Sequence, residues 1–109
     1  MTTIDTITDQ VLAQYAKTLR EVYGPRVERI MLYGSRARGD FRTDSDYDVA
    51  VFLTDITSRW EEMGKLAEIE MKVFDDTGEM VHAMPYPARY WNDPSSPLMF
   101  EIRRDGQDL

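Results

Sequence analysis

Apolar residues recur at helical spacing in two long stretches of the chain. The first runs from Thr8 to Tyr23 and stops at Gly24-Pro25, a pair that cannot continue a helix. Its apolar positions are Val11, Leu12, Tyr15, Ala16, Leu19 and Val22. This spacing predicts an amphipathic helix that packs through one face.

The second helical stretch runs from Thr57 to about Asp75. Thr57 or Ser58 can cap its start, and Gly78 can end it. The apolar positions that we expect on its buried face are Trp60, Met63, Leu66, Ala67, Ile69, Met71 and Phe74. A last short helix is predicted from about Ser96 to Arg104.

Three shorter segments have the pattern of strands. Val27–Tyr33 and Tyr47–Leu53 are rich in β-branched and apolar residues, and Glu79–Tyr86 alternates between apolar and other side chains. Pro85 and Pro87 confine the third strand to a sheet edge or end it. Between the first two strands, Arg36 to Gly39 leaves room for about one helical turn.

The predicted order is helix, strand, turn, strand, helix, strand, helix. Strands joined by a loop of about a dozen residues are usually neighbours. We therefore expect an α+β fold in which helices pack on a small mixed sheet. A chain of 109 residues suits one domain spanning residues 1–109.

Composition narrows the function classes. With 13 Lys and Arg against 20 Asp and Glu, the formal net charge is -7, which disfavours direct binding to nucleic acid or to an anionic membrane. The chain has no cysteine, so thiol catalysis and cysteine-based zinc sites are excluded. The first ten residues lack the apolar core of a signal peptide, and no apolar run approaches the roughly 18 residues of a spanning helix. We expect a cytoplasmic protein.

The candidate chemistry lies between the first two strands. Gly34-Ser35 follows the first strand directly, and Asp46-Tyr47-Asp48 opens the second after ten intervening residues. A glycine lets a phosphate approach the backbone, and the hydroxyl of Ser35 can donate to it. Asp46 and Asp48 fall on the same face of a strand, because side chains alternate at every residue. Two such carboxylates suit Mg²⁺ bound to a triphosphate.

Three arginines reverse the local charge of this acidic chain. Arg36, Arg38 and Arg42 lie within seven residues of one another, and guanidinium groups neutralise phosphates well. Of the three, Arg42 is the weakest candidate. Each feature also has a structural explanation, since glycine-serine turns, acidic strand faces and surface arginines are all common. Their coincidence at one end of two adjacent strands favours a phosphate site.

The segment Tyr33-Gly-Ser-Arg-Ala-Arg-Gly39, followed by Ser45-Asp-Tyr-Asp-Val49, resembles the signature of the nucleotidyltransferase superfamily related to DNA polymerase beta. It is especially similar to the minimal nucleotidyltransferase branch. The match covers about Leu32 to Leu53, with looser similarity over the helix order and the tail from Pro97 to Gly106.

This resemblance implies specific roles. Gly34 and Ser35 would hold the phosphates of ATP, and Asp46 and Asp48 would hold Mg²⁺. A nucleoside monophosphate, most plausibly AMP, would pass to a hydroxyl, such as that of a tyrosine, with loss of pyrophosphate. Many minimal nucleotidyltransferases are antitoxin partners of HEPN-type ribonuclease toxins. The resemblance therefore implies an antitoxin that modifies such a toxin.

One position departs from the family pattern. Active relatives commonly carry a third carboxylate on the strand after the second long helix, and the corresponding position here is His82. A neutral imidazole can act as general base but suits Mg²⁺ poorly. His82 is thus a candidate catalytic residue, with simple packing as the alternative. Glu79 is the alternative acid, if the register of the predicted strand is shifted.

The missing carboxylate keeps a second hypothesis open. The protein could be a catalytically silent antitoxin that keeps the fold and neutralises its partner by binding alone. The retained Gly34, Ser35, Asp46 and Asp48 argue against this. Transfer to a small molecule of the aminoglycoside type is disfavoured by the length of the chain, which leaves no second domain to enclose the acceptor.

Overall fold

The two central strands form at the β-branched segments that the sequence predicts. In a computed structural model that describes residues 6–40 and 46–109, β1 spans Val27–Tyr33 and β2 spans Tyr47–Leu53. They pair antiparallel, and Tyr33 lies opposite Asp48. The end of β1, where the glycine turn begins, therefore adjoins the start of β2, which carries the aspartates.

Two edge strands complete the sheet, whose order is β3-β2-β1-β4. Strand β3 (Val81–Pro87) runs parallel to β2, beginning two residues later than predicted. Its two prolines lie on an edge strand, as expected. Strand β4 (Gln107–Asp108) pairs antiparallel with β1, and the sequence did not predict it. The sheet is mixed, and the α+β prediction is confirmed.

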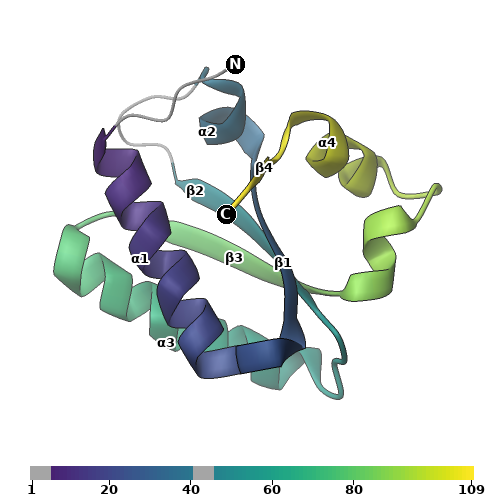
Figure 1. Cartoon of the computed structure of the whole chain (residues 1–109), viewed down its shortest axis with the longest axis horizontal. Coiled ribbons are helices and arrows are strands. Elements are labelled where there is room, and N and C mark those ends of the chain that lie inside the picture. Colours follow the sequence, from purple (N-terminus) through teal and green to yellow (C-terminus); the bar gives the residue numbers. More distant parts are fainter. Residues whose placement is uncertain (1–5, 41–45) are drawn as a thin grey trace.

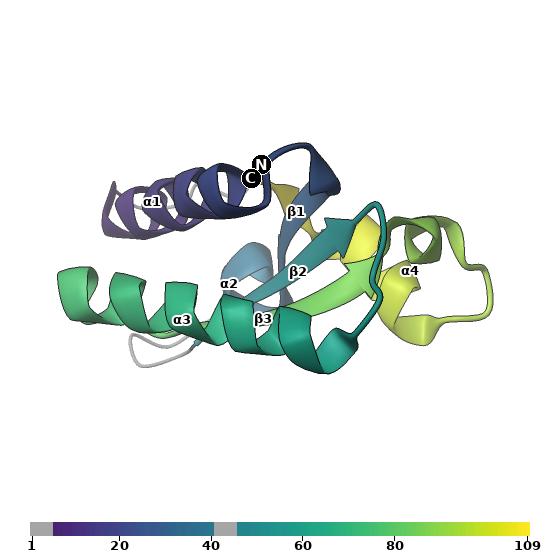
Figure 2. The same ribbon diagram turned by 90° about the horizontal axis from the view of Figure 1, so that it is seen from below.

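Helices cover both faces of the sheet (Figures 1 and 2). The long helices α1 (Thr6–Tyr23) and α3 (Arg59–Thr77) lie side by side on one face. Helix α4 (Pro97–Asp105) and the 3₁₀ helix η2 (Ala88–Asn92) cover the other. Two short elements complete the described fold, η1 (Gly24–Arg26) and α2 (Gly34–Arg38).

The helix boundaries follow from capping side chains. The Ser58 hydroxyl accepts a hydrogen bond from the Glu61 N–H at the start of α3, as predicted. Ser96 caps α4 in the same way. At the other end of α3, Gly78 has a φ of +77°, the left-handed conformation that ends many helices. The starts of α3 and α4 are thus fixed by serine caps.

The strand alternation of β2 divides the core in two. Val49 and Val51 pack toward α1 and α3, whereas Ala50 and Phe52 pack toward α4. The α1 and α3 side holds most of the buried residues, and the smaller α4 side also contains Met99. Strand β2 is therefore buried on both faces.

The predicted buried face of α3 is right at Leu66 and Ile69 and wrong at its other positions. The buried residues of α3 are Glu62, Leu66, Ile69 and Val73. Most of the predicted face is exposed: Trp60, Met63, Ala67, Met71 and Phe74. The helix has two apolar rows, and helical spacing does not reveal which row meets the sheet. In α1, similarly, Tyr23 is buried at the end of the helix while the predicted Val22 is exposed.

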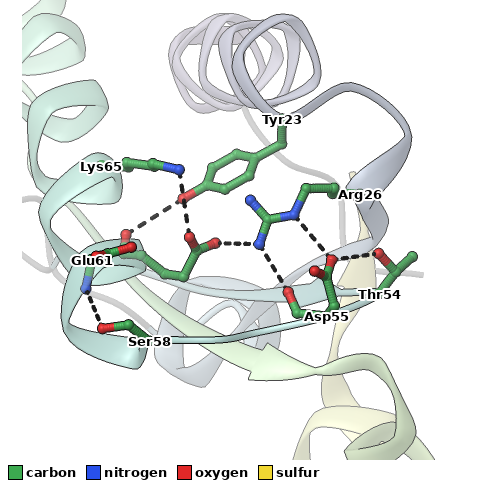
Figure 3. Close-up of polar contacts among 8 residues, drawn as sticks. Tyr23, Arg26, Thr54, Asp55, Ser58, Glu61 and Lys65 are labelled. Carbon is green, nitrogen blue, oxygen red and sulfur yellow. Dashed lines mark hydrogen bonds and ion pairs between the residues drawn. The ribbon is translucent and has the colours of Figure 1, made fainter.

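A polar cluster explains how Glu62 is buried. Its carboxylate accepts a hydrogen bond from Arg26 at 2.9 Å and lies 3.6 Å from the ammonium of Lys65. Arg26 also binds Asp55, where β2 has ended, and its guanidinium stacks on Tyr23 (Figure 3). A buried carboxylate is tolerated when it is paired in this way. The cluster ties η1 to the start of α3.

No helix in the described part of the chain combines the length and hydropathy that a membrane span requires.

Candidate functional site

The glycine of the β1–α2 turn lies directly against an aspartate of β2. Gly34 has a φ of +75°, which L side chains rarely adopt. A Cβ atom built on Gly34 would lie 2.6 Å from Oδ2 of Asp48. Any residue other than glycine would therefore strain the backbone and displace the carboxylate. The structure brings together Gly34 and Asp48, two of the predicted site residues.

Asp48 carries an electrostatic penalty in this position. It is half-buried, and burial is the main cause that raises its pKa above the ordinary value. The nearby charges of Asp46 and Glu101 raise the pKa further, whereas His82 and Arg38 lower it. A half-buried carboxylate among other acids is an environment in which a bound cation would be stabilising.

Asp46 immediately precedes β2 and is exposed. Among the residues that the structure describes, no group of three or more His, Cys, Asp or Glu side chains could hold a metal ion. Two neighbouring carboxylates nevertheless fit Mg²⁺, because this ion is usually held by one or two carboxylates, with phosphates and water as its other ligands. The absence of a side chain at Gly34 lets the Asp48 carboxylate lie against the backbone of the β1–α2 turn.

The short helix α2 is fixed from two sides. Gly39 ends it in the left-handed conformation and donates its N–H to the Ser35 carbonyl at 2.9 Å. The side-chain amide of Gln107 in β4 donates to the Ala37 carbonyl at 2.9 Å. The unpredicted edge strand β4 thus holds the turn that carries Ser35.

The predicted arginines have different environments. Arg36 is buried, and its guanidinium lies 4.1 Å from the centre of the Tyr47 ring. Arg38 is more exposed, and its guanidinium lies 3.3 Å from both Asp40 and Glu101. A nucleotide-binding role stays a prediction for both, with Arg38 the more accessible. Arg42 lies outside the described residues.

His82 occupies the position expected from the sequence. It lies on β3 in register with Asp48 of the neighbouring strand and is exposed. Its imidazole is near enough to lower the pKa of Asp48. Glu79, the alternative from a register slip, precedes β3. A catalytic role for His82 stays a prediction.

Two residues near the site were missed by the sequence analysis. Glu101 reaches Arg38 from α4, and its charge raises the pKa of Asp48. Tyr33 ends β1, and burial, with smaller contributions from charges including those of Asp48 and Glu101, raises its pKa to about 12. The sequence carried no signal for Glu101, because its proximity depends on how α4 packs across the sheet.

Comparison with known proteins identifies the family. The family described as "Polymerase beta, Nucleotidyltransferase" matches residues 13–84, which is more than half of the chain. MJ0604 of Methanocaldococcus jannaschii, provisionally named a protein adenylyltransferase, is 33% identical over 43 residues. That alignment covers 39% of this chain and 43% of MJ0604, so the chain spans less than half of this relative.

Solved structures share the fold. A protein provisionally described as a minimal nucleotidyltransferase superposes with a TM-score of 0.57 at 22% identity, over 99% of this chain and 97% of that one. A toxin–antitoxin crystal structure with AMP-PNP superposes with a TM-score of 0.58, also at 22% identity, over 86% of this chain and 68% of that one. Because the family model matches residues 13–84, the chain belongs to the polymerase beta nucleotidyltransferase family.

Proposed function

We propose that this protein is a Mg²⁺-dependent nucleotidyltransferase that transfers AMP from ATP to a tyrosine hydroxyl of a HEPN-type ribonuclease toxin. The modification would neutralise the toxin, which makes the protein an antitoxin. A reaction of this kind would take place in the cytoplasm, where ATP and the toxin's RNA substrates are present.

The contact between Gly34 and Asp48 carries this proposal. Gly34 has a φ of +75°, and a Cβ atom at this position would lie 2.6 Å from a carboxylate oxygen of Asp48. This contact lies inside the region that matches the nucleotidyltransferase family. The carboxylate that lies against the β1–α2 turn is half-buried among other acids, an environment that a bound cation would stabilise, and the glycine would let a phosphate approach the same backbone.

Asp46 and Asp48 are the proposed ligands of Mg²⁺, and Gly34 and Ser35 are the proposed contacts of the triphosphate. When bound, the ion would stabilise the negative charge that develops on the phosphates. Arg38 lies where it can exchange its partners Asp40 and Glu101 for a phosphate oxygen.

The reaction forms one bond and breaks one. The acceptor oxygen attacks the α-phosphorus, and the bond from that phosphorus to the oxygen bridging to the β-phosphate breaks. Pyrophosphate leaves with the electron pair of the broken bond. The acceptor hydroxyl loses its proton, and we assign His82 as the base that receives it.

The comparisons support the choice of nucleotide and partner. One relative is named for protein adenylyl transfer, and one structure of the same fold is a toxin–antitoxin with an ATP analogue. Those properties belong to the relatives, and we extend them to this chain as a proposal.

A silent antitoxin that only binds its toxin is the second candidate. The observation that favours it is His82, which stands in register with Asp48 at the position where a third carboxylate is expected. Such a scaffold would not need the Asp46 and Asp48 carboxylates for neutralisation.

Intact-mass spectrometry of the toxin partner separates the two candidates. We expect wild-type protein with Mg²⁺ and ATP to make the partner heavier by one or more AMP groups. Asp46→Asn combined with Asp48→Asn should add no mass and fail to neutralise the toxin in cells, although the folded variant can still bind it. Full neutralisation by the double variant, with no mass added by the wild type and any of the four triphosphates, would establish the scaffold.

A further inference from the structure

Helix α3 presents a second apolar row to solvent. Trp60 is 84% exposed and Met71 is 67% exposed, and Met63, Ala67 and Phe74 continue the row. The spacings along the row are three, four, four and three residues, so these side chains share one face of the helix. The row is about 21 Å long. We call these five residues the outer row of α3.

Two hollows mark the Trp60 end of the outer row. One, of about 300 Å³, is lined by Trp60, Met63, Gly64 and Ala67. The other, of about 180 Å³, includes Arg59 beside Trp60 and the side chains of Tyr86, Tyr90 and two prolines. Apolar side chains of a partner could pack into these two hollows.

The edge of the sheet at β3, beside α3, is poorly suited to pairing with an added strand. The N–H of Ala83 is already bound by the Glu70 carboxylate at 2.8 Å, so it points away from β2. Pro85 and Pro87 share that orientation, because backbone direction alternates along a strand, and prolines have no N–H to offer. Among common modes of peptide recognition, strand addition is disfavoured, and a helix packing along the outer row fits.

The charges beside the outer row indicate which kind of partner helix would bind there. Glu61, Glu68 and Asp75 are spaced by seven residues and form an acidic row beside the outer row. No salt bridge holds any of the three within the described residues. A second copy of this chain, also with a net charge of -7, would bring like charges together. A helix with a basic rim would be attracted.

Helix α3 also lies beside the strand that carries His82. Glu70, one residue before Met71, binds Ala83, which follows His82. Helix α3 and β3 lie side by side, and the end of α3 is close to the start of β3 (Figures 1 and 2). The side chains of His82 and Asp48 lie on the α4 face of the sheet, because their strand neighbours Ala83 and Val49 pack on the α3 face. His82 is on the edge strand and near enough to Glu70 to lower its pKa, so a protein bound along α3 would reach the site by extending around β3.

We propose that the outer row of α3 is the docking surface for a basic amphipathic helix of the protein that receives the nucleotide. The role as acceptor dock rests on the proposed function, whereas helix binding by this surface is measurable without catalysis. Docking would use binding energy from a surface remote from the reacting hydroxyl to hold it near the site.

A fluorescein-labelled synthetic helix tests the surface directly. The probe is a peptide of about 18 residues, five helical turns, with leucine on one face and lysine and arginine on the other. A peptide with the same residues in scrambled order is its control. Binding to wild-type protein is measured by fluorescence anisotropy at low and high salt, and sedimentation of the protein alone reports self-association.

We expect Met71→Lys to raise the dissociation constant by at least about tenfold, because it removes apolar contact and adds repulsion. Val22→Lys, at a residue 54% exposed on α1, is the matched control and should change it less than about twofold. Glu68→Gln should weaken binding at low salt and have little effect at high salt.

Equal binding of the scrambled peptide, or wild-type affinity in Met71→Lys, would overturn the proposal. So would a wild-type dimer that Met71→Lys converts to monomer, since a second copy would then occupy the surface. The rise in melting temperature with Mg²⁺-ATP is measured for every protein. If Mg²⁺-ATP does not raise the melting temperature of the wild type, the proposed function is contradicted. The peptide measurements then test separately whether the outer row binds a helix.

Discussion

Gly34→Ala is a substitution whose effect can be divided into two parts with a matched control. Gly34 and Gly78 have nearly the same backbone conformation, with φ values of +75° and +77°. A Cβ at Gly78 would meet no atom within 4 Å, whereas a Cβ at Gly34 would lie 2.6 Å from Oδ2 of Asp48. The two alanine variants thus share the backbone strain and differ in the displaced carboxylate.

The backbone part is about 1 kcal/mol in either variant. A left-handed conformation costs an L residue about 1–2 kcal/mol, and the loss of glycine's freedom in the unfolded chain offsets about 0.4–1 kcal/mol of this. For a domain of this size, about 1 kcal/mol lowers the melting temperature by about 4 °C.

The site-specific part concerns position rather than stability. To reach ordinary van der Waals contact at 3.4 Å, the Asp48 oxygen must recede by about 0.8 Å. A terminal carboxylate can do this at low cost, but metal–ligand distances vary by only about 0.2 Å. Gly34→Ala should therefore lose metal-dependent nucleotide binding while remaining folded.

Thermal unfolding with and without Mg²⁺-ATP measures both parts. We expect similar melting temperatures for Gly34→Ala and Gly78→Ala without ligand, both below wild type. Added Mg²⁺-ATP should raise the melting temperature of wild type and Gly78→Ala but not of Gly34→Ala. A wild-type shift in Gly34→Ala would refute the assigned role of the Gly34–Asp48 contact.

Three further predictions concern single side chains. The hydroxyl of Tyr15 is buried without a hydrogen-bond partner among the described residues, so Tyr15→Phe should stabilise the protein by about 1 kcal/mol in urea unfolding. Tyr23→Phe is the control and should not stabilise it, because the Tyr23 hydroxyl donates to a backbone carbonyl. Because the pKa of Asp48 is raised in the folded protein, its ionisation opposes folding, and stability falls as pH rises from the unfolded pKa to the folded one. Asp48→Asn should therefore be more stable than wild type at pH 7 without metal. The difference in free energy of unfolding between the two proteins should disappear below about pH 4, and a difference that persists there would contradict this. Arg38→Gln should weaken ATP binding in titration calorimetry and cost less than about 1 kcal/mol of stability, and unchanged affinity would remove Arg38 from the site.

Local sequence was a good guide where a segment's structure depends on its own residues. Strands β1 and β2 have the predicted bounds, because apolar and β-branched residues form a run of strand length between turn residues. The cap of α3 at Ser58 and its end at Gly78 were predicted for the same reason. The Gly-Ser and Asp-x-Asp signals lie at the adjoining ends of two paired strands, as the short connection between them indicated.

Features that depend on distant contacts could not be predicted. Glu62 is buried because Arg26 from η1 neutralises it, so the buried row of α3 is shifted from the predicted one. Strand β4 is only two residues long and is defined by pairing with β1. The burial of Arg36 against Tyr47 and the approach of Glu101 to Arg38 likewise depend on tertiary packing.

We propose that the end of the sheet with Gly34 and Asp48 directs transfer of a nucleoside monophosphate. The most direct test incubates the protein and its toxin partner with Mg²⁺ and ATP radiolabelled at either the α- or the γ-phosphate. We expect the α-label to become attached to the partner and the γ-label to be released as pyrophosphate. Neither should occur with Asp46→Asn combined with Asp48→Asn. Attachment of the γ-label to the partner, or α-label transfer that survives the double substitution, would contradict it.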